Sequence, residues 1–215
     1  MKKALSIITF CLFTLAIQAQ TTNEKFVKAM EKALSGMDTL KTAGQWLECS
    51  NTFERIALKE PKEWLPAYYV ALGHDMAFNL SQDVSKQELL AKRAEAFINK
   101  ADALNPDNAE IYVLKSMISS LFIRLNPMIN GQKYGPLAAA QLEKALALDP
   151  SNPRAYMQKG LTLFFTPAQW GGDKEKGKEL FEMADAKFVV FKAASTIHPV
   201  WGNRMNNMFL EMANQ

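Results

Sequence analysis

The chain has 215 residues, a formal net charge of +3, and a composition that is 48% hydrophobic and 22% charged. This hydrophobic fraction excludes an intrinsically disordered chain, and the nearly balanced charge argues against a nucleic-acid partner. Only two histidines and two cysteines are present, which are too few for a structural zinc site or a multi-histidine metal centre. We expect a folded protein that needs no metal or cofactor, built as one domain or as an array of small modules.

The first 19 residues have the features of a secretory signal peptide. A basic start precedes an apolar stretch at residues 4–17, and Ala19 supplies the small residue before a cleavage site. The alternative is a membrane anchor, but this stretch is shorter than the about 20 apolar residues that span a bilayer. We expect residues 1–19 to be removed, and the mature chain, residues 20–215, to be periplasmic or secreted, with no membrane span.

Helical periodicity dominates the rest of the sequence, and a spacing of 44 residues repeats within it. Tyr68, Tyr112 and Tyr156 follow this spacing, and a proline ends the helix-like segment before each of them. Those segments, and a fourth without its proline, carry small residues around a large one at Cys49/Phe53/Ile56, Ala94/Ile98/Ala101, Ala138/Leu142/Ala145 and Gly177/Phe181/Ala184. Such positions share one helical face, where small residues let a neighbouring helix approach closely. We interpret Cys49 as a buried thiol in a packing position.

This pattern resembles tetratricopeptide repeats, in which helix pairs stack and the second helix carries Ala-x3-Phe-x2-Ala before a proline. The resemblance implies an all-α fold, an α-solenoid of about four helix pairs with a C-terminal capping helix. The units are expected at residues 22–61, 66–106, 109–150 and 153–190, and the capping helix at residues 199–213.

The period of 44 residues is longer than the family's repeat of about 34 residues. The additional residues fall between the two helices of a unit, where the helices could lengthen or the turns could become loops. Loops are suggested at residues 79–83, 126–136 and 166–173. Such turns project from one edge of a solenoid, so we expect the loops to cluster there. Candidate binding residues on this loop edge are Met128, Tyr134 and Trp170.

Several segments outside the repeat motif are similar to a group of small exported helical-repeat proteins of Gram-negative bacteria. These segments are residues 53–56, 64–69, 132–135, 152–154, 170–172 and 198–202. The similarity implies a shared fold and export, and it implies no particular biochemical activity.

The sequence contains no pattern that predicts catalysis or metal binding. A nucleophile needs a base within reach, and we assign local structural roles to both histidines, His74 in a helix and His198 before a proline. Carboxylates such as Asp107 and Glu110 fall at helix starts, where capping explains them. Lysines and acidic residues alternate at residues 174–187, as on a solvated helix face. We expect no enzymatic activity, and we name no catalytic or metal-binding residue.

In the tetratricopeptide family the first helix of each pair lines a concave groove. When the three tyrosines set the register, the groove positions are apolar: Tyr69, Met76, Val113, Met117, Leu121, Met157, Leu161, Phe164 and Phe165. Methionine-rich apolar surfaces suit helical or extended apolar partners. The alternative is that the C-terminal helix or tight packing fills the groove.

Two functions are therefore open. The first is a non-enzymatic scaffold or adaptor that binds a protein or peptide outside the cytoplasm, through the groove or the loop edge. The second is a periplasmic accessory component that binds a small apolar ligand or partners the substrate-binding protein of a transporter. A closed apolar pocket between the groove and the C-terminal helix would favour the second.

Overall fold

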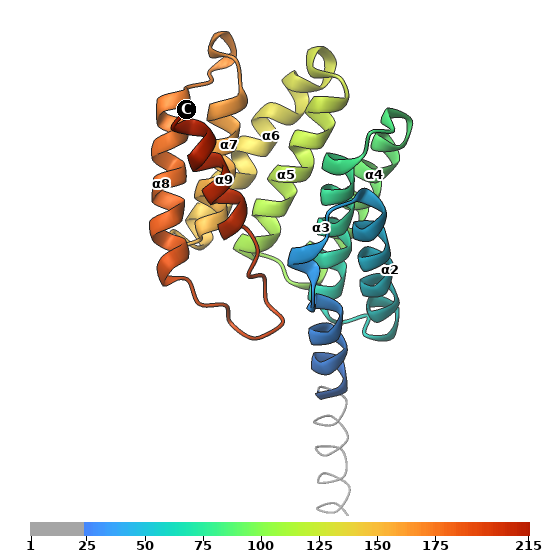
Figure 1. The fold of residues 1–215 in the computed structure, drawn as a ribbon. Coiled ribbons are helices and arrows are strands. Elements are labelled where there is room, and N and C mark those ends of the chain that lie inside the picture. Colours follow the sequence, from blue (N-terminus) through green and yellow to red (C-terminus); the bar gives the residue numbers. More distant parts are fainter. Residues whose placement is uncertain (1–23) are drawn as a thin grey trace, which may run out of the picture.

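A computed structural model describes residues 24–215, and over this range the chain is an all-α solenoid without strands (Figure 1). The fold class expected from the repeat is therefore confirmed. The proposed signal peptide lies outside the described residues. The helices pack in consecutive pairs: residues 24–34 with α2 (Ala43–Lys59), α3 (Trp64–Leu80) with α4 (Val84–Leu104), α5 (Ala109–Leu125) with α6 (Pro127–Leu148), and α7 (Pro153–Phe165) with α8 (Lys174–Val190). The chain ends with α9 (Asn203–Ala213), which packs on α8.

The helix starts repeat as the sequence does. Asn108 caps α5 by accepting hydrogen bonds from two backbone N–H groups of its first turn, and Asn152 caps α7 in the same way. A side-chain cap satisfies N–H groups that have no partner within the helix. At the start of α2, Thr42 and Gln45 form a reciprocal capping box.

The second helices pack through their small residues. Ala94, Ala101, Ala138, Ala145, Gly177 and Ala184 are all buried, as are the large residues Phe53 and Phe181. Gly160 of α7 shows why size matters, because a Cβ there would lie 2.7 Å from the ring of Phe181. Gly73 of α3, which the sequence pattern did not single out, would meet the Cβ of Ser50 at 2.8 Å.

Cys49 lies among these packing positions but is half-buried rather than enclosed. Its Sγ is 3.9 Å from the carbonyl oxygen of Ala33, in the helix of residues 24–34. Burial raises the pKa of the thiol, which disfavours the reactive thiolate.

The additional residues within each pair lengthen helices as well as forming loops. Asn126 alone separates α5 from α6, so residues 127–136, expected in a loop, are instead the first turns of α6. Asn126 caps this helix and Pro127 takes its first position, where a missing N–H costs nothing. A loop does join α7 to α8, and it contains the short 3-10 helix η2 (Ala168–Trp170). All three junctions project from the same edge of the solenoid (Figure 1).

The largely buried helix α3 contains a carboxyl group in its interior. Asp75 is 1% exposed, its Oδ2 accepts a hydrogen bond from Nδ2 of Asn79 at 3.1 Å, and its Oδ1 has no partner among the described residues. Burial raises the pKa of Asp75 to about 7, although Arg124 and Asn79 oppose the shift.

We therefore predict that the contribution of Asp75 to the free energy of unfolding falls as the pH rises from about 4 to about 7. The unfolded carboxyl group ionises near its ordinary pKa of 3.8, so in this range the folded state keeps a proton that the unfolded state has lost. Asp75→Asn should remove most of this slope and stabilise the protein at pH 8 by on the order of 2 kcal/mol. Urea unfolding of both proteins at about pH 5 and pH 8 measures the effect, and identical slopes would contradict it.

Candidate functional site

The segment between α8 and α9, residues 191–202, crosses the lower end of the solenoid (Figure 1). We call this segment the strap. Its Thr196 Oγ1 donates a hydrogen bond to Oε1 of Glu31, in the first described helix, at 2.7 Å. From α3, the hydroxyl of Tyr69 donates to the carbonyl oxygen of Ile197 at 3.0 Å. The strap therefore reaches from the last helix pair to the first.

A buried ion pair fixes the end of the strap. Arg154 of α7 is 0% exposed, and its Nε and Nη2 donate to the two carboxylate oxygens of Glu110 at 2.7 and 2.6 Å. Its Nη1 donates to the carbonyl oxygen of Trp201 at 3.0 Å, and the indole N–H of Trp201 donates to the hydroxyl of Tyr68 at 2.9 Å. Burial opposes the guanidinium charge, but Glu110 keeps the pKa of Arg154 above its ordinary value. From the sequence we explained Glu110 by helix capping alone. In the structure Glu110 also forms an ion pair with Arg154 on another helix.

The strap and the helix packing fill most of the groove that the sequence predicted. Tyr69, Val113, Met117, Leu121 and Met157 are at most 7% exposed and do not line an open groove. The reason is visible at Tyr69, whose ring stacks on Phe53 of α2 at 4.8 Å and so belongs to the core between helices. The other groove positions are more accessible, with Met76, Leu161 and Phe164 half-buried and Phe165 56% exposed.

An exposed apolar surface remains where α9 meets the end of α7. This α7–α9 patch consists of Phe165, Met208, Phe209 and Met212, and the exposed fractions of Phe165, Met208 and Met212 are 56%, 50% and 44%. The rings of Phe165 and Phe209 meet edge to face at 6.1 Å, and Phe209 stacks at 5.6 Å on the buried Phe181. The patch therefore rests on the core of the last helix pair.

Two residues fix the position of α9, the helix that carries most of this patch. Gly202, which precedes the helix, has φ 111°, a conformation that favours glycine. Asn206 is buried, and its Nδ2 donates to the carbonyl oxygen of Phe181 at 2.9 Å. The face of α9 that carries Asn206 is thus fixed against α8. Met208 and Met212 are one helical turn apart, so they lie together on another face of α9.

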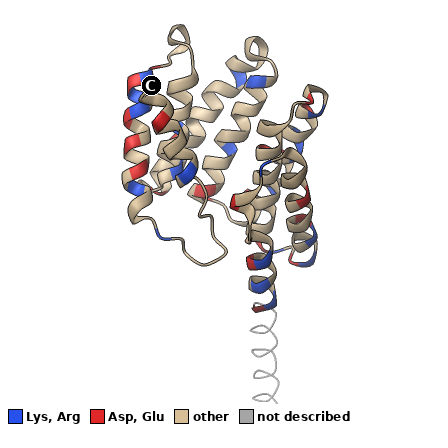
Figure 2. Ribbon diagram, in the orientation of Figure 1, with Lys and Arg blue, Asp and Glu red and all other residues tan. Residues whose placement is uncertain are grey.

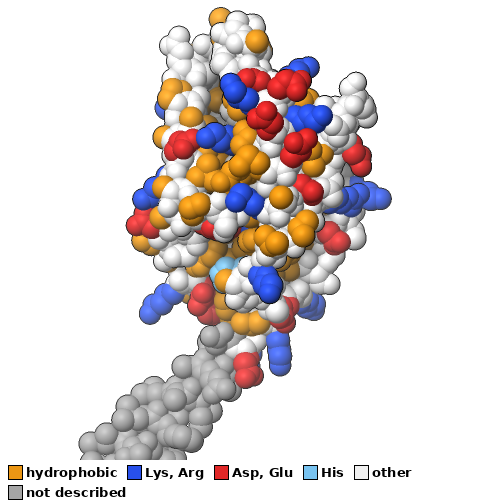
Figure 3. Space-filling view, turned by 90° about the vertical axis from the view of Figure 1, so that its left-hand side faces the viewer, with side chains coloured by type: hydrophobic (Ala, Val, Ile, Leu, Met, Phe, Trp, Pro, Cys, Tyr) orange, Lys and Arg blue, Asp and Glu red, His pale blue; other side chains and the backbone are white. Residues whose placement is uncertain are grey.

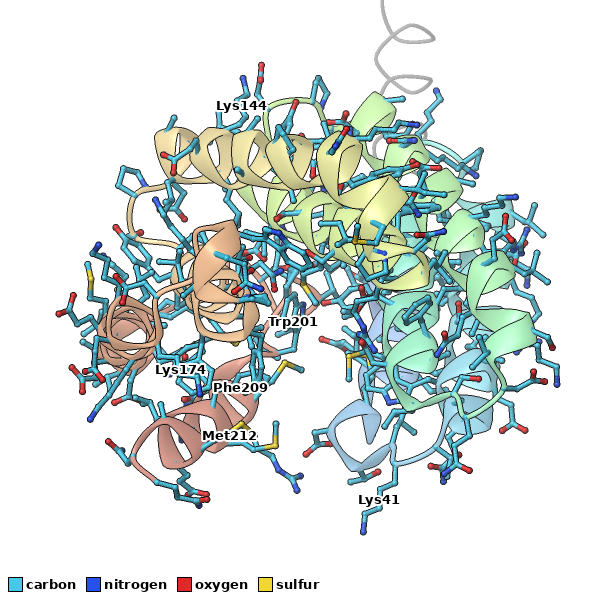
Figure 4. All side chains as sticks on the ribbon, turned by 90° about the horizontal axis from the view of Figure 1, so that it is seen from above. Lys41, Lys144, Lys174, Trp201, Phe209 and Met212 are labelled. Carbon is cyan, nitrogen blue, oxygen red and sulfur yellow. The ribbon has the colours of Figure 1, made fainter. Side chains whose placement is uncertain are left out.

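A few basic side chains lie near the patch or opposite it. The Nζ atom of Lys174 lies 5.6 Å from the ring centre of Phe164, which contacts Phe165 at 5.1 Å, and Figure 4 shows Lys174 beside Phe209. Arg204 precedes Met208 by one helical turn, and Lys41 lies across the open side of the C-shaped solenoid (Figure 4). The patch can therefore take an apolar ligand that carries negative charge.

The expected loop-edge residues lie on α6 and in the α7–α8 loop. Met128 is 76% exposed and Tyr134 is half-buried, with its ring stacked on Phe122 at 4.7 Å, and both lie on α6 rather than on a loop. Trp170 lies in η2 and is 62% exposed.

Neither histidine belongs to the patch. His74 is 6% exposed, with its Nδ1 2.9 Å from Oγ of Ser50, and the Nδ1 of His198 lies 2.7 Å from Oγ of Ser195 in the strap. Burial lowers the pKa of both imidazoles, so both are neutral at pH 7. In the described part of the chain, no group of three or more His, Cys, Asp or Glu residues is arranged to hold a metal ion.

A cavity of about 330 Å³ opens between the strap and the starts of α5 and α7. Its lining combines the charged residues Asp107, Asp149 and Lys192 with apolar ones such as Leu148, Phe191 and Pro199.

No protein-family model and no curated protein matches the chain. A solved structure that matches is the HusA haemophore from Porphyromonas gingivalis, with 30% sequence identity and a TM-score of 0.77, over 87% of this chain and 92% of that chain. The protein is an all-α solenoid of helix pairs, and it shares this fold with the HusA haemophore. The chain belongs to the family of the HusA haemophore.

Sequence reasoning missed the two parts that form this site. The strap was not expected to contact the first helices, although Arg154 and Trp201 fall in two of the segments that carried the resemblance to exported proteins. The helix α9 was expected only as a cap. The spacing of Met205, Met208 and Met212 on one side, with Asn203, Asn207 and Glu211 on another, was the available signal for an exposed apolar flank.

We predict that Glu110→Ala destabilises the protein by about 3 to 5 kcal/mol, because Arg154 would keep a buried charge without its partner. Glu143→Ala is the matched control, since the Glu143–Lys159 pair is solvent-exposed and such pairs contribute at most about 1 kcal/mol. Urea unfolding monitored by circular dichroism measures both. Equal losses in the two variants would contradict a special role for the buried pair.

Proposed function

We propose that the protein binds a flat, apolar ligand of the haem type outside the cytoplasm and does not convert it. The observation that carries the proposal is the exposed α7–α9 patch, in a chain of the same family as a haemophore. An apolar surface with a few basic groups at its edge is typical of a binding site.

The chemistry of haem fits the patch. Its aromatic ring can stack on Phe165 and Phe209, and the flexible thioethers of Met208 and Met212 can adapt to its edge. Its two carboxylates can pair with basic groups such as Lys174. Among the patch side chains, only the methionine sulfurs are iron ligands known from haem proteins. We therefore expect contact with the ring to supply most of the affinity.

This proposal follows the second of the two functions that the sequence left open. The family relation and the patch both favour a small apolar ligand, whereas a protein or peptide partner has no comparable support. The signal peptide expected at residues 1–19 agrees with a ligand met outside the cytoplasm, and a binding protein of this kind needs no catalytic residue.

The test is titration of the purified protein with ferric haem and with metal-free protoporphyrin, followed by absorbance. We predict that Phe165→Ser, and separately Met208→Ser with Met212→Ser, weaken binding of both ligands by about tenfold or more, since each removes apolar contact with the ring. The control is Val189→Ser with Val190→Ser at the far end of α8, where both side chains are more than 70% exposed (78% and 73%).

The control variant should bind as the original protein does. A failure of the original protein to bind either ligand, or equal losses in the patch and control variants, would overturn the proposal. If the variant with Met208→Ser and Met212→Ser lost haem binding but still bound protoporphyrin, a methionine sulfur would be a ligand of the iron.

A further inference from the structure

One edge of the solenoid carries exposed apolar side chains at each of its three tips. We call this set the apolar rim, and its members are Leu80 and Val84 at the α3–α4 junction, Met128 and Ile129 at the start of α6, and Trp170 in η2. Their exposed fractions are 41%, 72%, 76%, 71% and 62%. The tips lie together at the top of Figure 1, and Figure 3 shows hydrophobic side chains at that end of the molecule.

The turns at the opposite edge have another composition. They join one helix pair to the next at residues 60–63, 105–108 and 149–152, and they contain proline, polar and mostly acidic residues with no large apolar side chain. Exposed apolar side chains do occur near that edge, at Leu58, Val189 and Val190, but they lie on helix ends and in no turn between pairs.

The charges beside the rim are mainly basic (Figure 2). Across residues 79–87, 124–133 and 165–176 there are five basic and three acidic residues. Asp83 and Asp173 cap α4 and α8 and pair with Lys86 and Lys176 at 3.1 and 3.0 Å. Without these two pairs, three basic residues and one acidic residue are left. The rim therefore combines separated apolar tips with an excess of positive charge.

We propose that the apolar rim docks on the surface of an anionic phospholipid bilayer. A rigid protein partner would have to match three tips and the polar surface between them, whereas the interfacial region of a bilayer adapts to each tip. Tryptophan and aliphatic side chains enter that region readily, and nearby lysines are attracted by anionic headgroups. The contact is peripheral: within residues 24–215 no helix has the length and apolarity needed to cross a membrane.

The experiment is co-sedimentation of the purified protein with vesicles of phosphatidylcholine, with or without about 30% phosphatidylglycerol. We predict binding to the anionic vesicles that weakens with added salt. Met128→Ser with Ile129→Ser, and separately Trp170→Ser, should each reduce the partition coefficient by about tenfold. Val189→Ser with Val190→Ser is the matched control, because it removes equally exposed valines from the other end of the molecule, and it should leave partitioning unchanged.

A second readout follows the position of Trp170. Vesicles with brominated acyl chains should quench the tryptophan fluorescence, and Trp170→Phe should abolish most of this quenching. Circular dichroism of the rim variants shows whether they are folded, and the vesicle assay contains no haem, so its outcome is independent of the proposed function.

Three results would overturn the proposal. The first is an absence of binding to anionic vesicles, and the second is binding that the rim variants do not reduce. The third is concentration-dependent self-association without lipid that the rim variants abolish, which analytical ultracentrifugation would detect and which would assign the rim to a second copy of the chain.

Discussion

The buried pair between Arg154 and Glu110 holds the closing part of the molecule in place. The two residues are 44 positions apart and so occupy equivalent places on successive first helices. A buried charge is tolerated only when it is paired and fully hydrogen-bonded, and Arg154 meets this condition through Glu110 and the carbonyl oxygen of Trp201. The chain enters α9 directly after Trp201. The surface that we assign to ligand binding therefore depends on an interaction that makes no contact with it.

The solenoid fills its concave side with its own chain and presents an apolar surface elsewhere. Trp201 lies inside the C-shaped solenoid (Figure 4), where an open superhelix would offer a groove to a partner. The exposed methionines lie instead on α9, next to Phe209, whose ring stacks on that of Phe181. Flexible side chains on a rigid aromatic base can adapt to a ligand while the backbone stays fixed.

The repeat could be predicted from the sequence, because local spacing encodes it. The tyrosines 44 residues apart and the small residues of the second helices indicate an all-α solenoid of consecutive helix pairs. Residues 127–136 misled the prediction, since two glycines and Pro136 suggest a loop, yet capping by Asn126 and packing of Tyr134 on Phe122 keep them helical. The groove and the strap were beyond prediction from local pattern. Which side of an apolar helix is covered depends on segments distant in sequence, and a contact such as Tyr69 to Ile197 leaves no periodic signal.

The reach of the strap also changes how this solenoid should unfold and fold. In an open array each repeat contacts only its neighbours, so terminal repeats can fray while the centre persists. Here the hydrogen bond from Thr196 to Glu31 joins residues 165 positions apart, and it ties the last repeat to the first. Fraying of either end then costs contacts at the other, which makes unfolding more cooperative. The same contacts are non-local and form slowly, so we expect the strap to close after the individual helix pairs have formed.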